Sequence, residues 1–300
     1  MPLQAWSSAA YTFPLPEGHR FPIEKYALLR DAVVVEGLVA ASQIHEPPRA
    51  TVEELARVHT RDYIDRLTRG TLSDAELRLL GFPWSPALVE RSYRAVGGTL
   101  SAARSALRDG VAMNLAGGTH HAFPDRGEGF CVFNDVAVAV RALRADGSIG
   151  RAAIIDLDVH QGNGTHAIFA DDAETFTFSM HGVRNYPFHK VPGTLDIELD
   201  DGTGDAEYLA RLADALPRVL NDGTPDLVVY LAGADPHERD RLGRLKLTFD
   251  GLERRDAMVL EACRDVGIPV AITIAGGYGI DVRETVAIHA ATVRIATQFA

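Results

Sequence analysis

Cysteines, long apolar runs and basic clusters are all scarce in this 300-residue chain. Its two cysteines, Cys131 and Cys263, are too few for the disulfide framework of a small secreted protein, so we expect a reducing compartment. No apolar stretch reaches the roughly 18 to 20 residues of a membrane span, and the first 30 residues lack the apolar core of a signal peptide. We therefore expect a cytoplasmic protein that does not enter a membrane.

Positive charge is also in short supply. The chain has 30 Lys and Arg against 41 Asp and Glu, which gives a formal net charge of −11. Because nucleic-acid backbones are bound by basic surfaces and no basic run is present, we expect no nucleic-acid partner. Such a charge accommodates cationic or neutral substrates more easily than acidic ones. The oligomeric state is left open by the sequence.

What the chain does contain is an alternation of strand and helix patterns, with 46% hydrophobic residues as in ordinary globular proteins. Short apolar runs predict strands at 111–115, 152–159, 174–180, 226–231 and 269–275, besides a short edge strand within 9–22. Helical patterns lie at 23–37, 87–107, 134–145, 206–220, 250–266 and 282–298. No repeat or linker interrupts them. We therefore expect one α/β domain over residues 1–300, with a mostly parallel central sheet flanked by helices.

Residues 152–166 carry the strongest chemical signal. The apolar run 152–155 is typical of a strand covered by helices on both faces. Asp156, Asp158 and His160 follow at every second position, so a continuing strand would point all three to one face. A carboxylate and an imidazole at this end of a strand suit a zinc ion. The same residues could also form a buried Asp-His hydrogen bond that orders a turn.

Three other strand ends carry polar side chains, at His120-His121, Asp235 and Tyr278. Because the carboxyl ends of parallel strands lie along one edge of a sheet, we expect these residues to converge on one crevice. Asp158, His160 and Asp235 would then supply three metal ligands. That number leaves one position open for water or substrate, as in catalytic rather than structural zinc sites.

The motifs around these residues resemble those of the histone deacetylase superfamily, and the resemblance covers almost the whole chain. The matching segments are Gly117–Ala122, Gly129–Asp135, Asp156–Gly164, Gly233–Asp235 and Gly276–Gly279. The Gln-Gly-Asn-Gly sequence at 161–164 and the Tyr-Thr-Phe-Pro-Leu-Pro sequence at 11–16 are similar to class IV deacetylases and their bacterial deacetylase-like relatives. The resemblance implies a single-domain arginase/deacetylase-like fold.

For the chemistry, the resemblance implies a zinc-dependent hydrolase that removes an acetyl or longer acyl group from an amine such as acyl-lysine. It makes Asp158, His160 and Asp235 the zinc ligands. It makes His121 the general base and later acid, with His120 holding the water and Tyr278 donating to the oxyanion. Asp156 would orient His120 and Asn163 would orient His121. Many family members have an aspartate in place of Asn163, so His121 should be less basic here.

Other residues receive roles from the resemblance alone. The substrate tunnel would be lined by Phe130, Gly129, Gly276 and Gly277. A structural potassium ion would be bound by Asp156, Ser179, Met180 and the main chain of Asp158 and His160. The family's rim aspartate, which grips a peptide main chain, has no match in the 81–86 loop. Residues 186–189 are a candidate for the opposite tunnel wall.

Several alternatives remain open. A binuclear manganese ureohydrolase of the arginase type shares the fold but needs additional bridging carboxylates, where this chain has Gly162 and His237. The segment 162–167 formally fits a dinucleotide fingerprint, but Asp156 and Asp158 would repel the pyrophosphate. A catalytically weak acyl-lysine or polyamine-binding protein would be favoured only if a ligand or Tyr278 were missing. The sequence does not distinguish zinc from iron or identify the amine.

Overall fold

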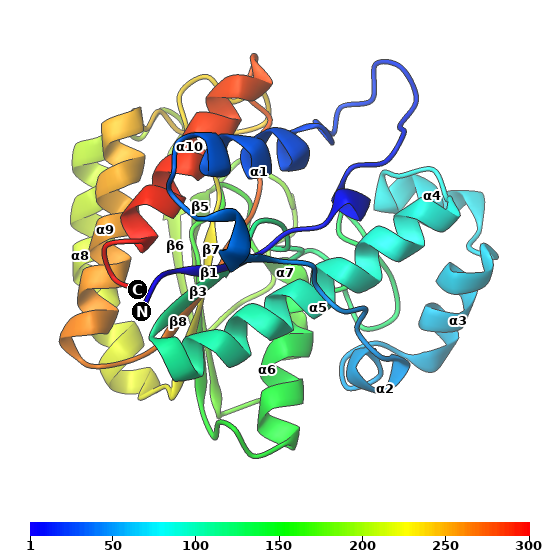
Figure 1. Ribbon diagram of the computed structural model, residues 1–300, viewed down its shortest axis with the longest axis horizontal. Helices are drawn as coiled ribbons and strands as arrows, with labels where there is room; N and C mark the ends of the chain where they lie inside the picture. The colour runs from blue at the N-terminus through cyan, green and yellow to red at the C-terminus, as the bar shows by residue number, and fades with distance from the viewer.

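A single sheet of eight parallel strands runs through the centre of the molecule (Figure 1). The computed structural model describes residues 1–300. The strands are β1 (Gln4–Trp6), β2 (Ile44–His45), β3 (Val111–Asn114), β4 (Ala152–Asp156), β5 (Thr175–Gly182), β6 (Leu195–Leu199), β7 (Leu227–Ala232) and β8 (Val270–Ile274). Their order across the sheet is β2-β1-β3-β8-β7-β4-β5-β6. The expected parallel α/β architecture is confirmed.

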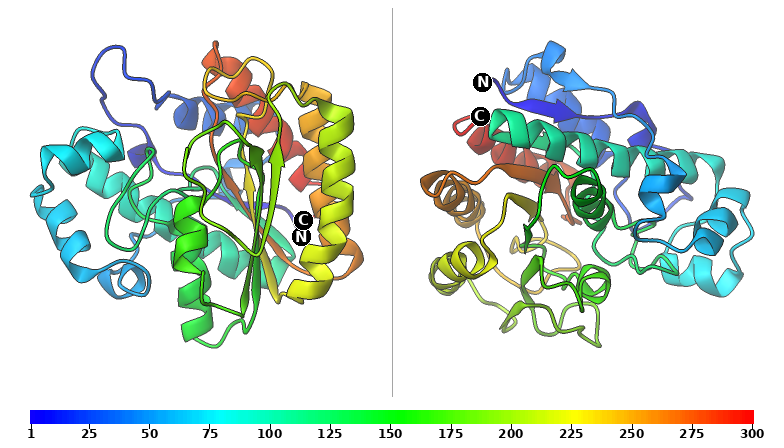
Figure 2. Two further views of the ribbon diagram at one scale, coloured as in Figure 1. Left: turned by 180° about the vertical axis from the view of Figure 1, so that it is seen from behind. Right: turned by 90° about the horizontal axis from the view of Figure 1, so that it is seen from below.

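Helices cover both faces of this sheet. They are α1 (Lys25–Val35), α2 (Val52–Leu55), α3 (Arg61–Arg69), α4 (Asp74–Leu80), α5 (Pro86–Asp109), α6 (Asp135–Ala145), α7 (Asn163–Ile168), α8 (Asp205–Gly223), α9 (Phe249–Asp265) and α10 (Val282–Ala296). Figure 2 shows α6, in green, on one side of the strands and α8, in yellow-green, on the other. The whole sheet is therefore enclosed, as parallel sheets generally are.

Alternating side chains of β7 show how one strand serves both faces. Leu227, Val229 and Leu231 belong to the apolar cluster that includes α5 and α6. Val228 and Tyr230 belong to the larger cluster that includes α8, α9 and α10. Since successive side chains of a strand point to opposite faces, a nearly continuous apolar run is what two buried faces require.

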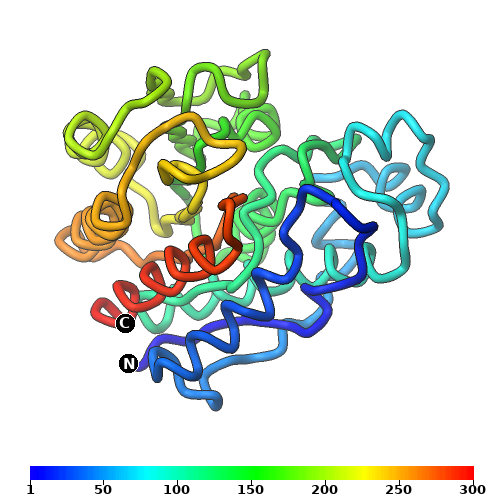
Figure 3. Tube along the Cα trace, turned by 90° about the horizontal axis from the view of Figure 1, so that it is seen from above, coloured from blue at the N-terminus to red at the C-terminus, as the bar shows by residue number.

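The segment between β1 and α1 crosses over to the group formed by α2, α3 and α4. Figure 3 shows this segment, in blue, beside the cyan helices at one end of the molecule, away from the two termini. The contact is made by Nε2 of His19, 3.0 Å from the carbonyl oxygen of Gly81, and by Phe21, whose ring centroid is 5.0 Å from that of Phe82. Two loops distant in sequence thus meet on the same side of the molecule.

Several local predictions were wrong. The expected edge strand within 9–22 is absent, because Ser8 accepts a hydrogen bond from the Ala10 N–H and opens a 3-10 helix at Ala9–Tyr11; the edge strand is Gln4–Trp6. The strand expected at 152–159 ends at Asp156 and is followed by a bend. Strand β6 was not predicted, because it lies at the edge of the sheet and carries the polar residues Asp196 and Glu198.

Both cysteines, Cys131 and Cys263, are buried and free, as expected for a chain without a disulfide framework. None of the helices has both the length and the apolar character needed to cross a bilayer.

Candidate metal centre and active site

The four central strands, β3, β8, β7 and β4, are neighbours in the sheet and end at the same edge. The segment after β3 carries His120 and His121, and the segment after β4 carries Asp158 and His160. Asp235 follows β7, and Gly276 to Tyr278 follow β8. The order of the strands thus brings together residues that are separated by more than 150 positions in the chain, as the sequence pattern predicted.

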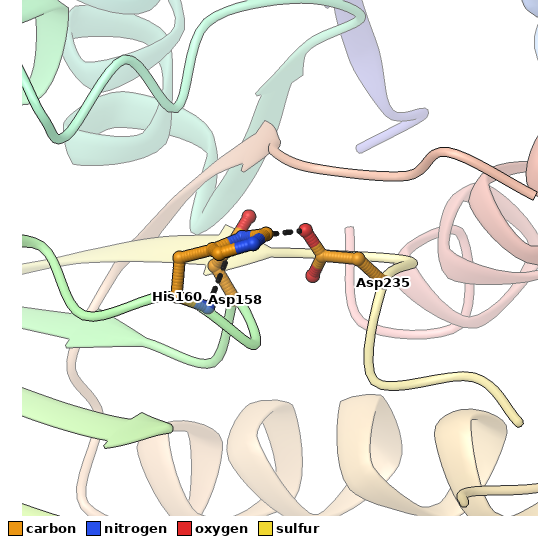
Figure 4. Close-up of side chains that lie close together, drawn as sticks. All are labelled: Asp158, His160 and Asp235. Atoms are coloured by element: carbon orange, nitrogen blue, oxygen red, sulfur yellow. Dashed lines mark hydrogen bonds and ion pairs between the residues drawn. The ribbon is translucent and has the colours of Figure 1, made fainter. Parts of the chain in front are cut away.

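Asp158, His160 and Asp235 form a cluster whose ligand atoms all lie within 4.8 Å of one another (Figure 4). Nδ1 of His160 is 2.9 Å from Oδ1 of Asp158 and 3.2 Å from Oδ2 of Asp235. All three residues are buried. The side chains converge although the strand ends at Asp156, because the bend over 158–160 turns them toward β7.

This cluster fits one divalent transition metal. Its donors are two carboxylates and one imidazole, a set that suits zinc and is also compatible with iron. Oδ2 of Asp235 is buried and receives no hydrogen bond from the protein. Burial and the charge of Asp158 raise the pKa of Asp235 to about 7. A cation between the two carboxylates would satisfy the free oxygen and reverse this unfavourable burial of negative charge.

Two glycines allow the cluster to close. A Cβ atom on Gly276 would overlap the carboxylate of Asp235 and lie 2.5 Å from Oδ2 of Asp158. The Gly276 N–H instead donates a hydrogen bond of 2.6 Å to that Asp158 oxygen. A Cβ atom on Gly233 would lie 2.7 Å from the Asp158 Cα. Side chains at either position would force the ligand segments apart.

Arg255 ties together the segments that carry the two aspartate ligands. Its guanidinium is fully buried within α9 and donates hydrogen bonds of 2.6 Å to the Gly233 carbonyl and 3.3 Å to the Leu157 carbonyl. Asp256 pairs with it at 2.7 Å. The sequence interpretation missed Arg255, since an arginine within a helix rich in charged residues carries no signal of facing the sheet.

The two histidines of the pair have different partners. Nδ1 of His120 lies 2.6 Å from Oδ2 of Asp156, and Nδ1 of His121 lies 2.7 Å from Oδ1 of Asn163. Burial opposes protonation of His120, but Asp156 and Asp158 outweigh it and raise the pKa of His120 to about 9. Burial and the positive charges of His120 and His160 lower the pKa of His121 well below its usual range.

These surroundings favour opposite protonation states for the two histidines. The carboxylate of Asp156, 2.6 Å from Nδ1, favours the protonated form of His120. His121 is neutral, and because the Asn163 oxygen accepts from its Nδ1–H, the free lone pair is on Nε2. A neutral imidazole with a free nitrogen is the form that can accept a proton. The hydrogen bond to Asn163 acts in the opposite direction and favours the protonated form of His121, so the lowered pKa comes from burial and the neighbouring histidines and not from Asn163.

Asn163 is itself held by Glu128, a buried residue that the sequence interpretation did not assign. Nδ2 of Asn163 donates a hydrogen bond of 2.8 Å to Oε1 of Glu128. The hydroxyl of Tyr186 donates a second bond of 2.7 Å to the same oxygen. The Tyr186 ring stands edge-on to His121 with centroids 4.9 Å apart. Position 163 thus needs a side chain that accepts on one side and donates on the other.

Tyr278 lies in the segment after β8 and is 8% exposed. Its N–H donates a hydrogen bond of 2.6 Å to Asp240, and its ring centroid is 6.4 Å from that of His160. Burial and the charges of Asp158 and Asp235 raise the pKa of Tyr278 well above its usual range. The hydroxyl, which makes no hydrogen bond within the protein, therefore keeps its proton and can donate a hydrogen bond to a ligand.

A cavity of about 760 Å³ leads from the surface to these groups, with Phe130, Gly129, His121, His160 and Tyr278 in its lining. Behind them is an inner space of about 30 Å³ that Gly276, Lys25 and Arg91 help to line. Gly277, also predicted for the tunnel, lines neither space, since a Cβ atom there would face Thr285 and Ala234.

Phe130 has a positive φ of 66°, a backbone conformation that is rare for a bulky residue. Its main chain is fixed by the hydrogen bond from its N–H to the Leu80 carbonyl, and its ring packs against Phe21 and Phe82 with centroids 5.4 and 5.3 Å away. These contacts hold the ring as a rigid wall of the cavity.

The residues expected around potassium lie beside the metal cluster. Asp156 of β4 is the direct neighbour of Ser179 in β5, and Met180 follows on the same strand. The Ser179 hydroxyl lies 2.9 Å from Nδ1 of the buried His181. The bend that carries Asp158 and His160 is tied to β5 by the hydrogen bond from the Gly182 N–H to the Val159 carbonyl.

Comparisons with known proteins agree with this geometry. A family model described as the histone deacetylase domain matches residues 19–293. An uncharacterized protein of Picosynechococcus is 45% identical over 279 residues, covering 93% of each chain. The histone deacetylase-like amidohydrolase of Pseudomonas aeruginosa is 32% identical over 287 residues, covering 88% of this chain and 74% of that protein. The crystal structure of an HDAC homolog complexed with SAHA has a TM-score of 0.88 at 27% identity, covering 100% of this chain and 85% of that one. This chain therefore belongs to the histone deacetylase family.

Proposed function

We propose that the protein is a zinc-dependent hydrolase that removes a short acyl group from an acylated amine. The observation that carries this proposal is the convergence of a three-ligand metal site, a neutral histidine and a protonated tyrosine at the end of one cavity. Membership in a family whose named relatives include an amidohydrolase supports it, as does a structural neighbour crystallised with SAHA.

Asp158, His160 and Asp235 would hold the zinc ion. When bound there, zinc supplies Lewis acidity, which polarises an amide carbonyl and makes water more acidic. His121 accepts the proton of the attacking water at its free Nε2 and returns it to the leaving amine. His120, a cation held by Asp156, stabilises the negative charge that develops during attack.

Tyr278 donates a hydrogen bond from its hydroxyl to the developing oxyanion. Its raised pKa keeps the donor intact across the working pH range. Asp156 and Asn163 position the two histidines through their Nδ1 atoms, and Glu128 fixes the Asn163 amide so that its oxygen faces His121. Each of these groups is buried, so the reaction occurs with little competing water.

The size of the two spaces favours acetyl or similarly small acyl groups. The outer cavity accommodates the amine part, while the inner space of about 30 Å³ receives the acyl end. That inner space is lined by two buried cations, Lys25 and Arg91. A long alkyl chain would have to displace protein atoms and lie beside charge, both of which are unfavourable.

We further propose a structural potassium ion near Asp156, Ser179 and Met180 and the main chain of Asp158 and His160. The direct pairing of β4 and β5 at Asp156 and Ser179 supports it. Such an ion would stabilise the bend that presents the zinc ligands.

The arginase-type alternative receives less support. The ligand cluster contains three residues and no further carboxylate that could bridge a second metal. His237, which follows Asp235 by two positions, packs against Phe249 with ring centroids 4.6 Å apart rather than joining the cluster.

The test is an activity assay on acyl-lysine amides without flanking charge, with acetyl, octanoyl and tetradecanoyl groups. Zinc-loaded protein should release free amine from the acetyl substrate at least about tenfold faster than from the longer ones, and chelation should abolish release. Iron-loaded protein is assayed in parallel. If neither metal supports amide hydrolysis in protein with full metal content, the proposed function is wrong.

A further inference from the structure

Five arginines surround the mouth of the outer cavity: Arg20, Arg78, Arg184, Arg241 and Arg244. They come from four separate segments, namely the loop before α1, the end of α4, the loop after β5 and the loop between β7 and α9. No aspartate or glutamate lines this cavity. In a chain with a net charge of −11, such a gathering does not follow from composition.

Most of these charges are not neutralised by the protein. Arg20 and Arg78 are exposed and form neither an ion pair nor a hydrogen bond in the structure. Arg241 donates through Nε to the Tyr278 carbonyl and has no carboxylate partner. Arg184 and Arg244 share Asp201, at 3.6 and 3.1 Å. Five arginines and one aspartate leave four positive charges in excess at the mouth.

Resting on the proposed function, we propose that the natural substrate is an acylated amine flanked by carboxylates, as in an acyl-lysine with acidic neighbours in a peptide. Guanidinium groups bind carboxylates through two parallel hydrogen bonds, and like charges gathered without a partner repel one another. A substrate that brings negative charge to the rim removes that repulsion. A polyamine, being a cation, would add to it.

The distribution of the arginines favours an extended substrate. They stand on four separate segments that line the cavity, so a chain with acidic residues before and after the acylated lysine could contact several of them. The wall residues Phe130 and Tyr186 would enclose the apolar stem of the lysine between the rim and the metal cluster. A nucleic acid is disfavoured, since the remainder of the surface is acidic and would repel a phosphate backbone.

The basic mouth favours acidic substrates, whereas the net charge of the whole chain favours cationic or neutral ones. The total of −11 favours cationic or neutral substrates only if charge is spread evenly over the surface. It is not, because the mouth is basic while the excess of acidic residues lies elsewhere. For recognition, the field at the mouth is the relevant quantity.

The experiment compares acetyl-lysine peptides of equal length flanked by Asp, Asn or Lys, with zinc-loaded protein at low and high salt. We expect kcat/KM to follow the order Asp, Asn, Lys, with about tenfold or more between the extremes at 50 mM NaCl and much less at 500 mM. Binding affinity, measured by fluorescence anisotropy with the zinc-loaded Tyr278→Phe protein, should also be highest for the Asp-flanked peptide and lowest for the Lys-flanked one. Comparing kcat/KM for free acetyl-lysine and for its amide tests whether the single carboxylate of a small molecule is enough for recognition by the arginines.

Arg20→Gln and Arg78→Gln remove charge without removing a side-chain hydrogen bond or ion pair within the protein. Each should lower the ratio of Asp-flanked to Asn-flanked kcat/KM by about two- to fivefold, in line with exposed charge pairs. Arg218→Gln is the matched control, an exposed arginine without ion pairs near the end of α8, which leads to the opposite edge of the sheet. It should leave the ratio unchanged.

The outcomes separate the two proposals. Equal kcat/KM for the three peptides, with the Asn-flanked peptide well hydrolysed, would overturn the charge selectivity and leave the hydrolase intact. If affinity falls in the order Asp, Asn, Lys but no peptide is hydrolysed, the charge selectivity of the rim is supported and the proposed hydrolase activity is wrong. The acidic peptide can also be competed with a single-stranded oligonucleotide at an equal concentration of negative charges. If the oligonucleotide displaces the peptide, the rim binds a phosphate polymer and the proposed acidic peptide is wrong.

Discussion

The floor of the site and its rim are built in opposite ways. On the floor, Asp158, His160, Asp235 and His121 are buried, held by hydrogen bonds and carried by the ends of central strands. On the rim, the five arginines are exposed and stand on α4 and three loops, and only Arg184 and Arg244 have a carboxylate partner. The difference indicates that the sheet determines the reaction, while the loops determine which amine reaches it. Changes to the floor should therefore abolish turnover of every substrate, whereas changes to the rim should alter only the relative kcat/KM values of different substrates.

The largest effect is expected from removing a metal ligand. Asp235→Ala and His160→Ala should lower zinc affinity by more than the ~10- to 100-fold cost of losing a supporting residue, and activity on all acyl amines should fall to background. Zinc content after dialysis and amine release are the measurements. Asp214→Ala, on the exposed side of α8, is the control and should retain both. Zinc binding that survives either ligand variant would place the metal elsewhere.

Tyr278→Phe should come next. The substitution removes one hydroxyl that has no partner within the protein, so zinc content and melting temperature should hardly change. Loss of an oxyanion donor typically costs ~10²–10³ in rate, about 3–4 kcal/mol of transition-state stabilisation. The loss should appear in kcat more than in KM. A variant that keeps wild-type kcat would show that the hydroxyl does not face the reacting carbonyl.

The Asn163 position offers a smaller and more specific effect, on pH dependence. His121 must be neutral to act as a base, and because its pKa is lowered, wild-type activity should persist as the pH falls well below 6.5. Asn163→Asp alone would set two carboxylates against each other at Glu128, and the protein should lose stability. Combining it with Glu128→Gln restores a donor between them.

In that double variant, the carboxylate at 163 should raise the pKa of His121. The acidic limb of kcat/KM should then move to higher pH, by about one unit. The pH profile of the neutral acetyl-lysine amide is the measurement, and the Glu128→Gln single variant is the control. An acidic limb that stays in place would mean that another group controls it.

Ionic strength should give the smallest effect and sharpens the contrast between floor and rim. Raising NaCl from 50 to 500 mM should raise KM several-fold for an acidic peptide and leave the neutral amide nearly unaffected, because exposed charges are screened and buried ones are not. Equal salt dependence for both substrates would remove the distinction.

The strand-end residues could be predicted because each lies in a compact motif that follows an apolar run. His120, Asp158, Asp235 and Tyr278 needed only a parallel sheet to converge. The bend after Asp156 could not be predicted, since the alternation of polar and apolar residues continues to His160 and is equally compatible with a strand.

Residues that act through tertiary contacts carried no local signal. Glu128 and Arg255 contact the site from segments where a charged residue would ordinarily face solvent. The rim arginines are dispersed over 225 positions, from Arg20 to Arg244, so no basic run marks them in the sequence. Net charge described the whole surface and therefore pointed away from the local field at the mouth.

The central claim is that one metal ion in this floor supports amide hydrolysis. Metal-free protein titrated with zinc, with activity on the acetyl-lysine amide followed at each addition, tests it most directly. Activity should rise to a plateau at one equivalent per chain, and Asp235→Ala should show no such rise. A requirement for two equivalents of manganese, with urea released from a guanidino substrate, would contradict the account.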